Sequence, residues 1–312
     1  MIYHIIEHSC YQKLTNGLAI PNIAKQLGIE CKSYSVAEFQ SGLIVRDSSP
    51  EAIFITESAF FREGLMSARE LRYRIPNGKL VNMASDSILF TRKKRNEFDF
   101  CVDHFDLWLD TMEECKEYYQ SKGLFADIWR WTISDKYIDL IDDYLFKLKE
   151  GLMYEPLEKQ KDYVCLARLH SPYRLKLKQY LDAKGLKGTF GTGVLSSDLK
   201  DLYELYNTSW VALGTTSPAG QDDIRTMKGF RDWIAPFFGT MLLYDDHPEM
   251  KWASTVLPTY NYNDFDEIKD FIIDVKNYTA MHKQYVKQQK QFILNHTIEK
   301  QLISLFKKHS II

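Results

Sequence analysis

The chain has 312 residues, of which 45% are hydrophobic and 26% are charged, and its formal net charge is −2. This composition is ordinary for a globular protein, and the length favours two domains. The five cysteines form no CxxC pair and are odd in number, which favours free thiols in a reducing cytoplasm over a disulfide framework. No apolar run reaches about 18 residues and no signal-peptide pattern is present, so we expect a cytoplasmic protein without a membrane span.

Strands alternate with helices in the first half of the chain. Apolar runs predict strands at 2–7, 30–36, 51–57, 79–84 and 99–104. Apolar residues at helical spacing predict a helix that ends at Gly28, a second over 111–121 and a third over 135–149. Residues 148–163 then lose this periodicity and carry Gly, Pro and charge, which is typical of a linker.

The same alternation continues in the second half. Apolar runs predict strands at 163–168, 188–191, 210–216 and 240–246. Helices are predicted over 171–185, with Ser171 as N-cap and Pro172 at the first helical position, over 196–207, and over 226–238.

This strand–helix alternation predicts an α/β fold with two Rossmann-like, doubly wound domains that face a central cleft. We expect an N-terminal domain at 1–150, a C-terminal domain at 151–280 and a last helical segment at 281–312. Ligands of such sheets bind at the carboxyl ends of the strands, and the cleft of a tandem pair is the default site.

A polar helix entrance at 226–231 is the first candidate site. Met227, Phe230, Ile234 and Phe237 share one helical face, so the first turn carries Thr226, Lys228, Gly229 and Arg231. First-turn amides and the helix dipole bind anions, and a basic side chain beside them strengthens the site, so phosphate is the expected ligand. In the alternative interpretation, Lys228 and Arg231 only point into solvent.

Several phosphate and catalytic motifs are missing from the sequence. No GxGxxG follows the first strand, which argues against a Rossmann-type epimerase or dehydrogenase, and no GxxxxGK[ST], HExxH, zinc spacing or GxSxG occurs. A single GxG at 191–193 is weak by itself.

The second half nevertheless resembles the nucleotide-sugar domain of GT-B glycosyltransferases, especially the bacterial spore-maturation-type group. The resemblance covers about 150 residues and rests on the order and spacing of five segments: YVCLARLHSPYRLKLKQYL, GTFGTGV, LYELYNTSWVALGTT, MKGFRDWIAPFFGTMLLYDD and ILNHTIEKQLISLF. It implies a nucleotide-sugar-dependent hexosyl- or pentosyltransferase whose co-substrate is a nucleoside-diphosphate sugar, most simply a UDP-sugar. It also implies no tightly bound cofactor, no metal, and a last helix that returns to the first domain.

The resemblance further implies a set of donor-binding residues. Arg168 and Arg174 would approach the diphosphate, and Gly191, Gly193 and Val194 would present backbone to the base. Thr226, Lys228 and Gly229, with Arg231 and Asp232 nearby, would meet the phosphates. The sequence departs from the family at Ile234, where the family has a Glu that holds the ribose hydroxyls, and Asp232 is the nearest carboxylate.

A base for the acceptor hydroxyl is expected in the first half. Asp86 follows the strand at 79–84, while Asp103 and His104 end the strand predicted at 99–104, so all three are candidates, with His8 a further one. Each is also explained as a capping or loop residue. Asp245 and Asp246 follow a strand, and we interpret them as a strand-end turn, not a metal pair.

Basic residues concentrate at 62–95, in the half expected to bind the acceptor. This region has nine Lys or Arg against three acids, which leaves an excess of +6 in a chain whose total is −2. Arg92, Lys93, Lys94 and Arg95 would bind a polyanion such as DNA with a hydroxymethylated base. The alternatives are a cell-surface or spore polysaccharide as acceptor, a merely solvated basic surface, and a non-catalytic GT-B-like nucleotide-binding protein.

Overall fold

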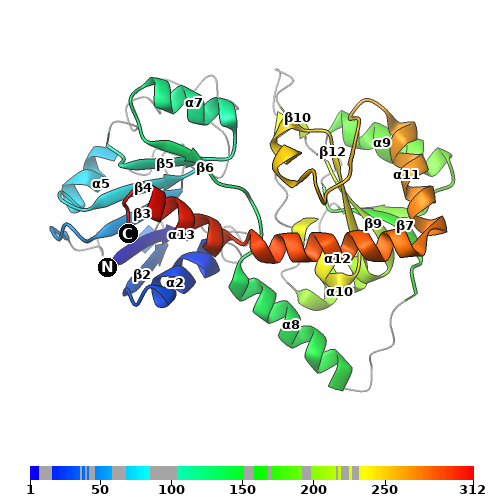
Figure 1. Ribbon diagram of the computed structural model, residues 1–312, viewed down its shortest axis with the longest axis horizontal. Coiled ribbons are helices and arrows are strands. Elements are labelled where there is room, and N and C mark those ends of the chain that lie inside the picture. Colours follow the sequence, from blue (N-terminus) through cyan, green and yellow to red (C-terminus); the bar gives the residue numbers. More distant parts are fainter. Residues whose placement is uncertain are drawn as a thin grey trace. The chain divides into compact units, whose positions relative to one another are not determined.

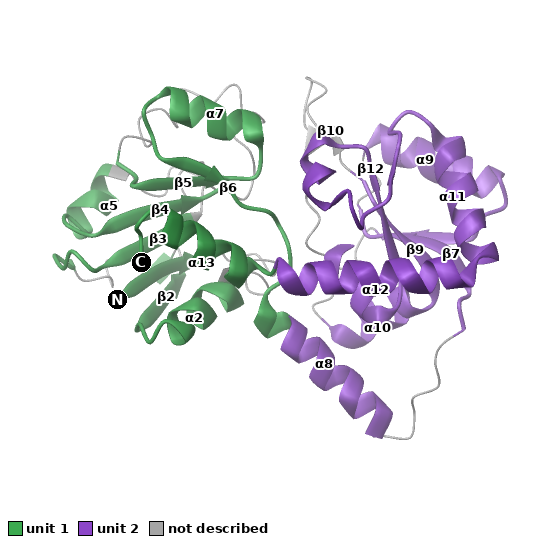
Figure 2. Cartoon of the chain, viewed as in Figure 1, with its two compact units in different colours: residues 1–137, 297–312 green, residues 138–296 purple. Residues whose placement is uncertain are grey.

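Two separate parallel sheets organise the chain, and each has helices packed around it (Figure 1). The chain divides into unit 1, residues 1–137 and 297–312, and unit 2, residues 138–296 (Figure 2). The described strands of each sheet lie within one unit, which confirms the prediction of two α/β domains. The computed structural model describes residues 1–6, 16–35, 37–38, 41, 46–57, 68–84, 104–150, 158–167, 171–191, 198–215, 217–218, 225–226 and 232–312.

Unit 1 contains a six-stranded sheet in the order β2-β1-β3-β4-β5-β6, and all of its paired strands are parallel. The strands are β1 Ile2–Ile6, β2 Cys31–Ser35, β3 Ile53–Glu57, β4 Lys79–Met83, β5 Leu107–Asp110 and β6 Ala126–Ile128. Its helices are α2 Asn16–Gln26, α5 Ala68–Arg74, α7 Glu113–Ser121 and α13 Ile298–Lys308, together with the start of α8 Asp135–Glu150. Central strands such as β4 and β5 are almost wholly buried, as parallel strands covered on both faces should be.

One strand of unit 1 differs from its prediction. The strand expected at 99–104 does not extend to His104, which lies in a turn, and residues 99–103 are outside the described part of the chain. The strand of this region is β5, whose apolar side chains Leu107, Trp108 and Leu109 are fully buried. Apolar residues lie on both sides of Asp106 in the sequence, and those that follow it form β5. The three-residue β6 is too short to show any periodicity.

Unit 2 contains a five-stranded sheet in the order β13-β12-β9-β7-β8, again with parallel pairing throughout. The strands are β7 Lys161–Cys165, β8 Gly188–Phe190, β9 Ser209–Gly214, β12 Met241–Asp245 and β13 Thr259–Tyr260. Its helices are α9 Pro172–Ala183, α10 Leu199–Asn207, α11 Phe265–Asn277 and α12 Thr279–Asn295, with the 3-10 helix η3 Pro248–Ala253. The predicted strands and helices of this half agree closely with these bounds, with one exception.

The exception is the helix predicted over 226–238. Thr226 lies in β11 Arg225–Thr226, which pairs antiparallel with β10 Ser217–Pro218. A 3-10 helix, η2, covers only Asp232–Phe238, and residues 227–231 are outside the described residues. All six residues from Trp233 to Phe238 are buried, so this segment has no polar face, and Pro236 lacks the N–H that an α-helix needs. Thr226 is therefore not in the first turn of an α-helix.

Gln289 of α12 completes the edge of the unit 2 sheet. Strand β13 pairs with β12 only at Tyr244 and Asp245, which leaves the start of β12 without a neighbour on that side. The buried Gln289 side chain fills this place: its Oε1 accepts from the Leu242 N–H (2.8 Å), and its Nε2 donates to the Leu242 C=O (2.7 Å). A side-chain amide thus pairs with both backbone groups of one strand residue.

The last helix, α13, belongs to unit 1 and packs against α2, whereas α12 belongs to unit 2. The buried Glu299 carboxylate of α13 accepts hydrogen bonds from Ser134 Oγ (2.6 Å), the Asp135 N–H (2.8 Å) and Asn22 Nδ2 (3.1 Å). Glu299 therefore joins α13 to α2 and to the start of α8.

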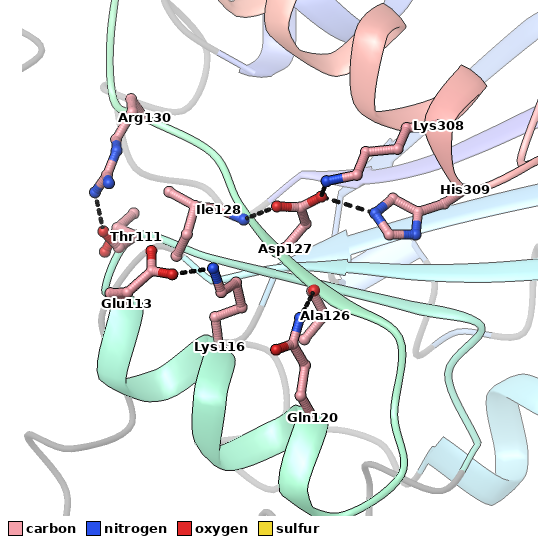
Figure 3. Close-up of polar contacts among 10 residues, drawn as sticks. All are labelled: Thr111, Glu113, Lys116, Gln120, Ala126, Asp127, Ile128, Arg130, Lys308 and His309. Atoms are coloured by element: carbon pink, nitrogen blue, oxygen red, sulfur yellow. Dashed lines mark hydrogen bonds and ion pairs between the residues drawn. The ribbon is translucent and has the colours of Figure 1, made fainter. Parts of the chain in front are cut away.

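The far end of α13 is attached to β6. Lys308 Nζ and His309 Nε2 lie 2.6 and 2.8 Å from Asp127 Oδ2 (Figure 3). Burial raises the pKa of Asp127, but hydrogen bonds from Lys308 and His309 outweigh burial, so the pKa is lowered overall. The carboxylate is thus held in its charged form between two basic side chains of the C-terminal segment.

We predict that Gln289→Leu destabilises the protein with little change in side-chain volume. The substitution leaves the N–H and C=O of Leu242 buried and unpaired, at a cost of roughly 1–3 kcal/mol for each group. Urea denaturation would measure the change in the free energy of unfolding. Gln291→Leu is the matched control, because Gln291 is exposed on the same helix and its side chain donates to Asn295 Oδ1 at 3.4 Å. Equal stability of the two variants would contradict this role of Gln289.

Candidate functional site

The carboxyl edge of the unit 2 sheet brings together several polar groups. Because β7, β9 and β12 are parallel, their last residues, Cys165, Gly214 and Asp245, lie at the same edge. Thr215 follows β9 directly, and Gly191 follows β8 and donates its N–H to the Cys165 C=O (2.8 Å). This edge is where open α/β sheets bind ligands.

Arg174 reaches this edge from the first turn of α9. Its Nε donates to Thr215 Oγ1 (2.9 Å), and its Nη2 donates to the Thr215 C=O (3.0 Å). Arg174 is partly buried and Thr215 is buried. The guanidinium is therefore bound along one edge by a single residue at the end of a core strand.

Charges of both signs act on the buried groups beneath this edge. Burial and the negative charge of Asp232 raise the pKa of the Cys165 thiol to about 12, although the positive charge of Arg174 opposes them. Burial raises the pKa of the Tyr244 phenol well above its usual value. The negative charge of Asp232 raises it further, and the positive charge of Arg174 lowers it. Arg174 and Asp232 thus lie close to the same strand ends.

The start of α9 has the features of an anion site. Ser171 is its N-cap as predicted, but the Ser171 hydroxyl makes no capping bond, and Pro172 occupies the first helical position. The Ser171 side chain is only 4% exposed, and its Oγ has no hydrogen-bond partner within the described part of the chain. Arg174 and the backbone N–H groups of the first turn of α9 are the groups at this position that would stabilise an anion.

Other predicted donor residues have different positions. Asp232 begins η2 and is partly exposed, whereas Ile234 is 1% exposed and lies in the core. Thr226 lies in β11, of which only the backbone is described. Arg168, Gly193, Val194, Lys228, Gly229 and Arg231 are outside the described residues, so their roles remain predictions.

The acidic groups around the end of β12 lie in a turn that leads into η3. Asp245, His247 and Glu249 are each buried. His247 is the N-cap of η3, and its Nδ1 accepts from the Glu249 N–H (3.2 Å). Among the described residues no group of three or more His, Cys, Asp or Glu has a geometry that could hold a metal ion. The arrangement fits the predicted strand-end turn.

Of the four predicted base candidates, the structure describes His104. His104 lies before β5, at its amino end, where its C=O accepts from Arg72 Nη2 (2.6 Å), so it is not at the carboxyl edge as predicted. The predicted end of the strand at His104 was wrong, and the expected position of His104 was therefore wrong too. Asp86, Asp103 and His8 are outside the described residues, although Asp86 comes three residues after the end of β4.

Sequence reasoning overlooked Asp110, which ends β5 at the carboxyl edge of the unit 1 sheet. Its Oδ1 accepts from the N–H groups of Thr111 (2.7 Å) and Met112 (3.1 Å). Burial raises the pKa of Asp110 to about 6, and the hydrogen bonds from the Met112 and Thr111 amides oppose that shift. Asp110 is fully buried, so it supports the start of α7 and cannot touch a bound acceptor.

Part of the basic region at 62–95 is engaged within the fold. Arg72 contacts Asp106 (2.8 Å) and donates to the Gly78 C=O (2.9 Å), and Arg74 contacts Glu70 (3.4 Å). Asp106 lies outside 62–95 and offsets the charge of Arg72, whereas Glu70 is already one of the three acids counted in the excess of +6. Arg92, Lys93, Lys94 and Arg95 are outside the described residues.

Comparisons with known proteins show the fold. No family model matches the chain, and no curated protein sequence matches it. HepE from Anabaena, solved with UDP and glucose, has a TM-score of 0.59 at 11% identity over 99% of this chain and 100% of that chain. An alpha-glucosyltransferase in complex with UDP and a 13-mer DNA has a TM-score of 0.64 at 10% identity, over 99% of this chain and 100% of that chain.

Sucrose-phosphate synthase from Thermosynechococcus elongatus has a TM-score of 0.63 at 9% identity, over 98% of each chain. The expected GT-B architecture is thereby confirmed. Among the described residues, no helix is long and apolar enough to cross a membrane.

We predict that the stability of Asp110→Asn relative to wild type increases with pH. The folded protein binds the Asp110 proton more tightly than the unfolded chain, so its contribution to stability is present below about pH 4 and is lost as the pH rises through about 6. Asparagine does not titrate but can still accept the two amide hydrogen bonds. The difference in unfolding free energy should change by up to about 3 kcal/mol between about pH 4 and pH 7. A difference that is constant with pH, measured by urea denaturation, would contradict this.

Proposed function

We propose that this protein is a glycosyltransferase that moves a sugar from a nucleoside-diphosphate sugar, most simply a UDP-sugar, to an acceptor hydroxyl. The observation that carries the proposal is the position of Arg174, which lies in the first turn of α9 and reaches the carboxyl edge of the unit 2 sheet at Thr215. Support comes from the GT-B fold and from matched structures that were solved with UDP.

The chemistry requires a stabilised leaving group. The acceptor oxygen attacks the anomeric carbon, the bond from that carbon to the diphosphate oxygen breaks, and the departing diphosphate gains negative charge. Positive charge and helix dipoles aimed at those oxygens lower the barrier. Arg174 and the amides of the first turn of α9 supply both, and we propose Arg168 and Lys228 as further contacts.

The acceptor proton needs a base. Asp86 is the candidate that the strand bounds favour, because it follows β4 at the carboxyl end of a parallel strand. Asp103 precedes His104, which lies at the amino end of β5, so the argument for Asp103 is weaker.

Ribose recognition should differ from that of the family. Ile234 is buried in η2 and has no group that can bind a hydroxyl. Asp232, at the start of the same helix and near Arg174, is the carboxylate that we propose in its place.

We predict that Arg174→Ala weakens UDP binding about 10- to 150-fold, the range expected for losing a charge-assisted phosphate contact. Isothermal titration on the folded protein would measure this affinity. Lys178→Ala is the matched control, because Lys178 lies one turn further along α9 and pairs with Asp182. UDP should also raise the melting temperature of the wild type. NAD(P) raising it instead would indicate an oxidoreductase, and no response to either would favour a non-catalytic protein.

The second candidate concerns the acceptor, which we propose to be a polyanion bound through Arg92–Arg95. The basic excess at 62–95 motivates it, and one matched glycosyltransferase was solved with DNA. A cell-surface or spore polysaccharide is the other acceptor class, and a neutral oligosaccharide in the same assay distinguishes the two.

We predict that duplex DNA binds and that its affinity falls steeply as salt rises, because bound cationic side chains release counterions. Replacing Arg92, Lys93, Lys94 and Arg95 together by Ser should reduce the slope of log affinity against log salt by up to about 3–4 and leave UDP affinity unchanged. Lys147→Ser with Lys149→Ser, on α8, is the control for nonspecific loss of charge. Absence of DNA binding at low salt would reject a DNA acceptor.

A further inference from the structure

The hydroxyl and the backbone carbonyl group of Thr215 both accept hydrogen bonds from Arg174. Its hydroxyl oxygen accepts from Arg174 Nε at 2.9 Å and its carbonyl oxygen accepts from Arg174 Nη2 at 3.0 Å. The residue is 6% exposed and follows the last residue of a central strand, so the contact is largely desolvated and rests on a rigid element. Charge-assisted hydrogen bonds in such surroundings are stronger than those at a surface.

The two hydrogen bonds to Thr215 fix the orientation of the Arg174 guanidinium. The guanidinium is planar, and its Nε and Nη2 donors lie along one edge. That edge faces Thr215, so the Nη1 side of the plane is directed away from Thr215. Arginine otherwise has several rotatable bonds, and holding it in one orientation in advance reduces the entropy lost when an anion binds.

We infer that Thr215 is a positioning residue for Arg174: it orients the guanidinium towards the diphosphate of the bound nucleotide, and so controls the affinity of the site. This inference rests on the proposed function. Thr215 and Arg174 both lower the pKa of the buried Cys165 thiol, against the larger effect of burial, so the threonine and the arginine both act on the end of β7.

Asp232 is a carboxylate whose charge acts on Cys165 and Tyr244, the same two groups on which the charge of Arg174 acts. Without the Thr215 hydroxyl, the guanidinium loses the hydrogen bond from its Nε, so its orientation is less restricted before the diphosphate binds.

The test compares UDP affinity across substitutions at Thr215, with inorganic pyrophosphate as a second probe that lacks a base. Thr215→Val keeps the shape but removes the hydroxyl, and should weaken binding of both probes about 5- to 20-fold. Thr215→Ser restores the hydroxyl and should bind within about 2-fold of wild type. Thr240→Val is the matched control, since it removes a buried hydroxyl that contacts the C=O groups of Tyr206 and Ser209 at the other end of the unit 2 sheet. It should lower stability and leave UDP affinity unchanged.

A double-mutant cycle separates positioning from a direct or structural effect. In an Arg174→Ala background, Thr215→Val should leave UDP affinity unchanged, because the residue through which it acts is gone. An equal loss in both backgrounds, or failure of Thr215→Ser to restore binding, would overturn the inference while the proposed function stands. If the wild type binds neither UDP nor pyrophosphate, the proposed function and this inference both fail.

Discussion

Parallel strand pairing is the constraint on which the rest of this protein depends. Because every strand of both main sheets runs in the same direction as its neighbour, each sheet has one edge at which all carboxyl ends meet. In unit 2 that edge gathers Thr215, Asp245 and the start of α9 from segments far apart in the sequence. A strand reversed within that sheet would move its polar end residue to the opposite edge, away from the start of α9.

Parallel sheets also leave backbone groups that must be satisfied by other means, and here side chains do so. Gln289 pairs with both backbone groups of Leu242 where β13 does not reach. Lys159 Nζ donates to the C=O groups of Ser209 (2.6 Å) and Gly239 (2.8 Å) at the amino end of β9. Arg174 does the same for Thr215 at the carboxyl end. The difference is that Arg174 carries its charge at the carboxyl edge of the sheet, where open α/β sheets bind ligands.

Much of the fold could be predicted from the sequence because its signals are local. Apolar runs such as those of β7 and β12, and helix boundaries such as Ser171-Pro172, depend on neighbouring residues alone. The errors arose where local signals conflicted with packing. The segment Trp233–Phe238 has apolar residues at helical spacing, but Pro236 and burial on every side make it a short 3-10 helix. The strand predicted at 99–104 did not include Leu107–Asp110, which form β5 by pairing with β4.

The sequence by itself determined the class of fold, the order of its elements and the presence of Arg174 beside a helix start, because periodicity and capping are encoded within a few residues. Only the tertiary structure decided which polar groups meet. Thr215 lies 41 positions from Arg174, and neither residue type predicts the other as its partner. His104 lies before β5 and Asp110 ends it, because β5 begins at Leu107. Side-chain contacts depend on the register and direction of strands that are distant in the chain, and no local pattern specifies those.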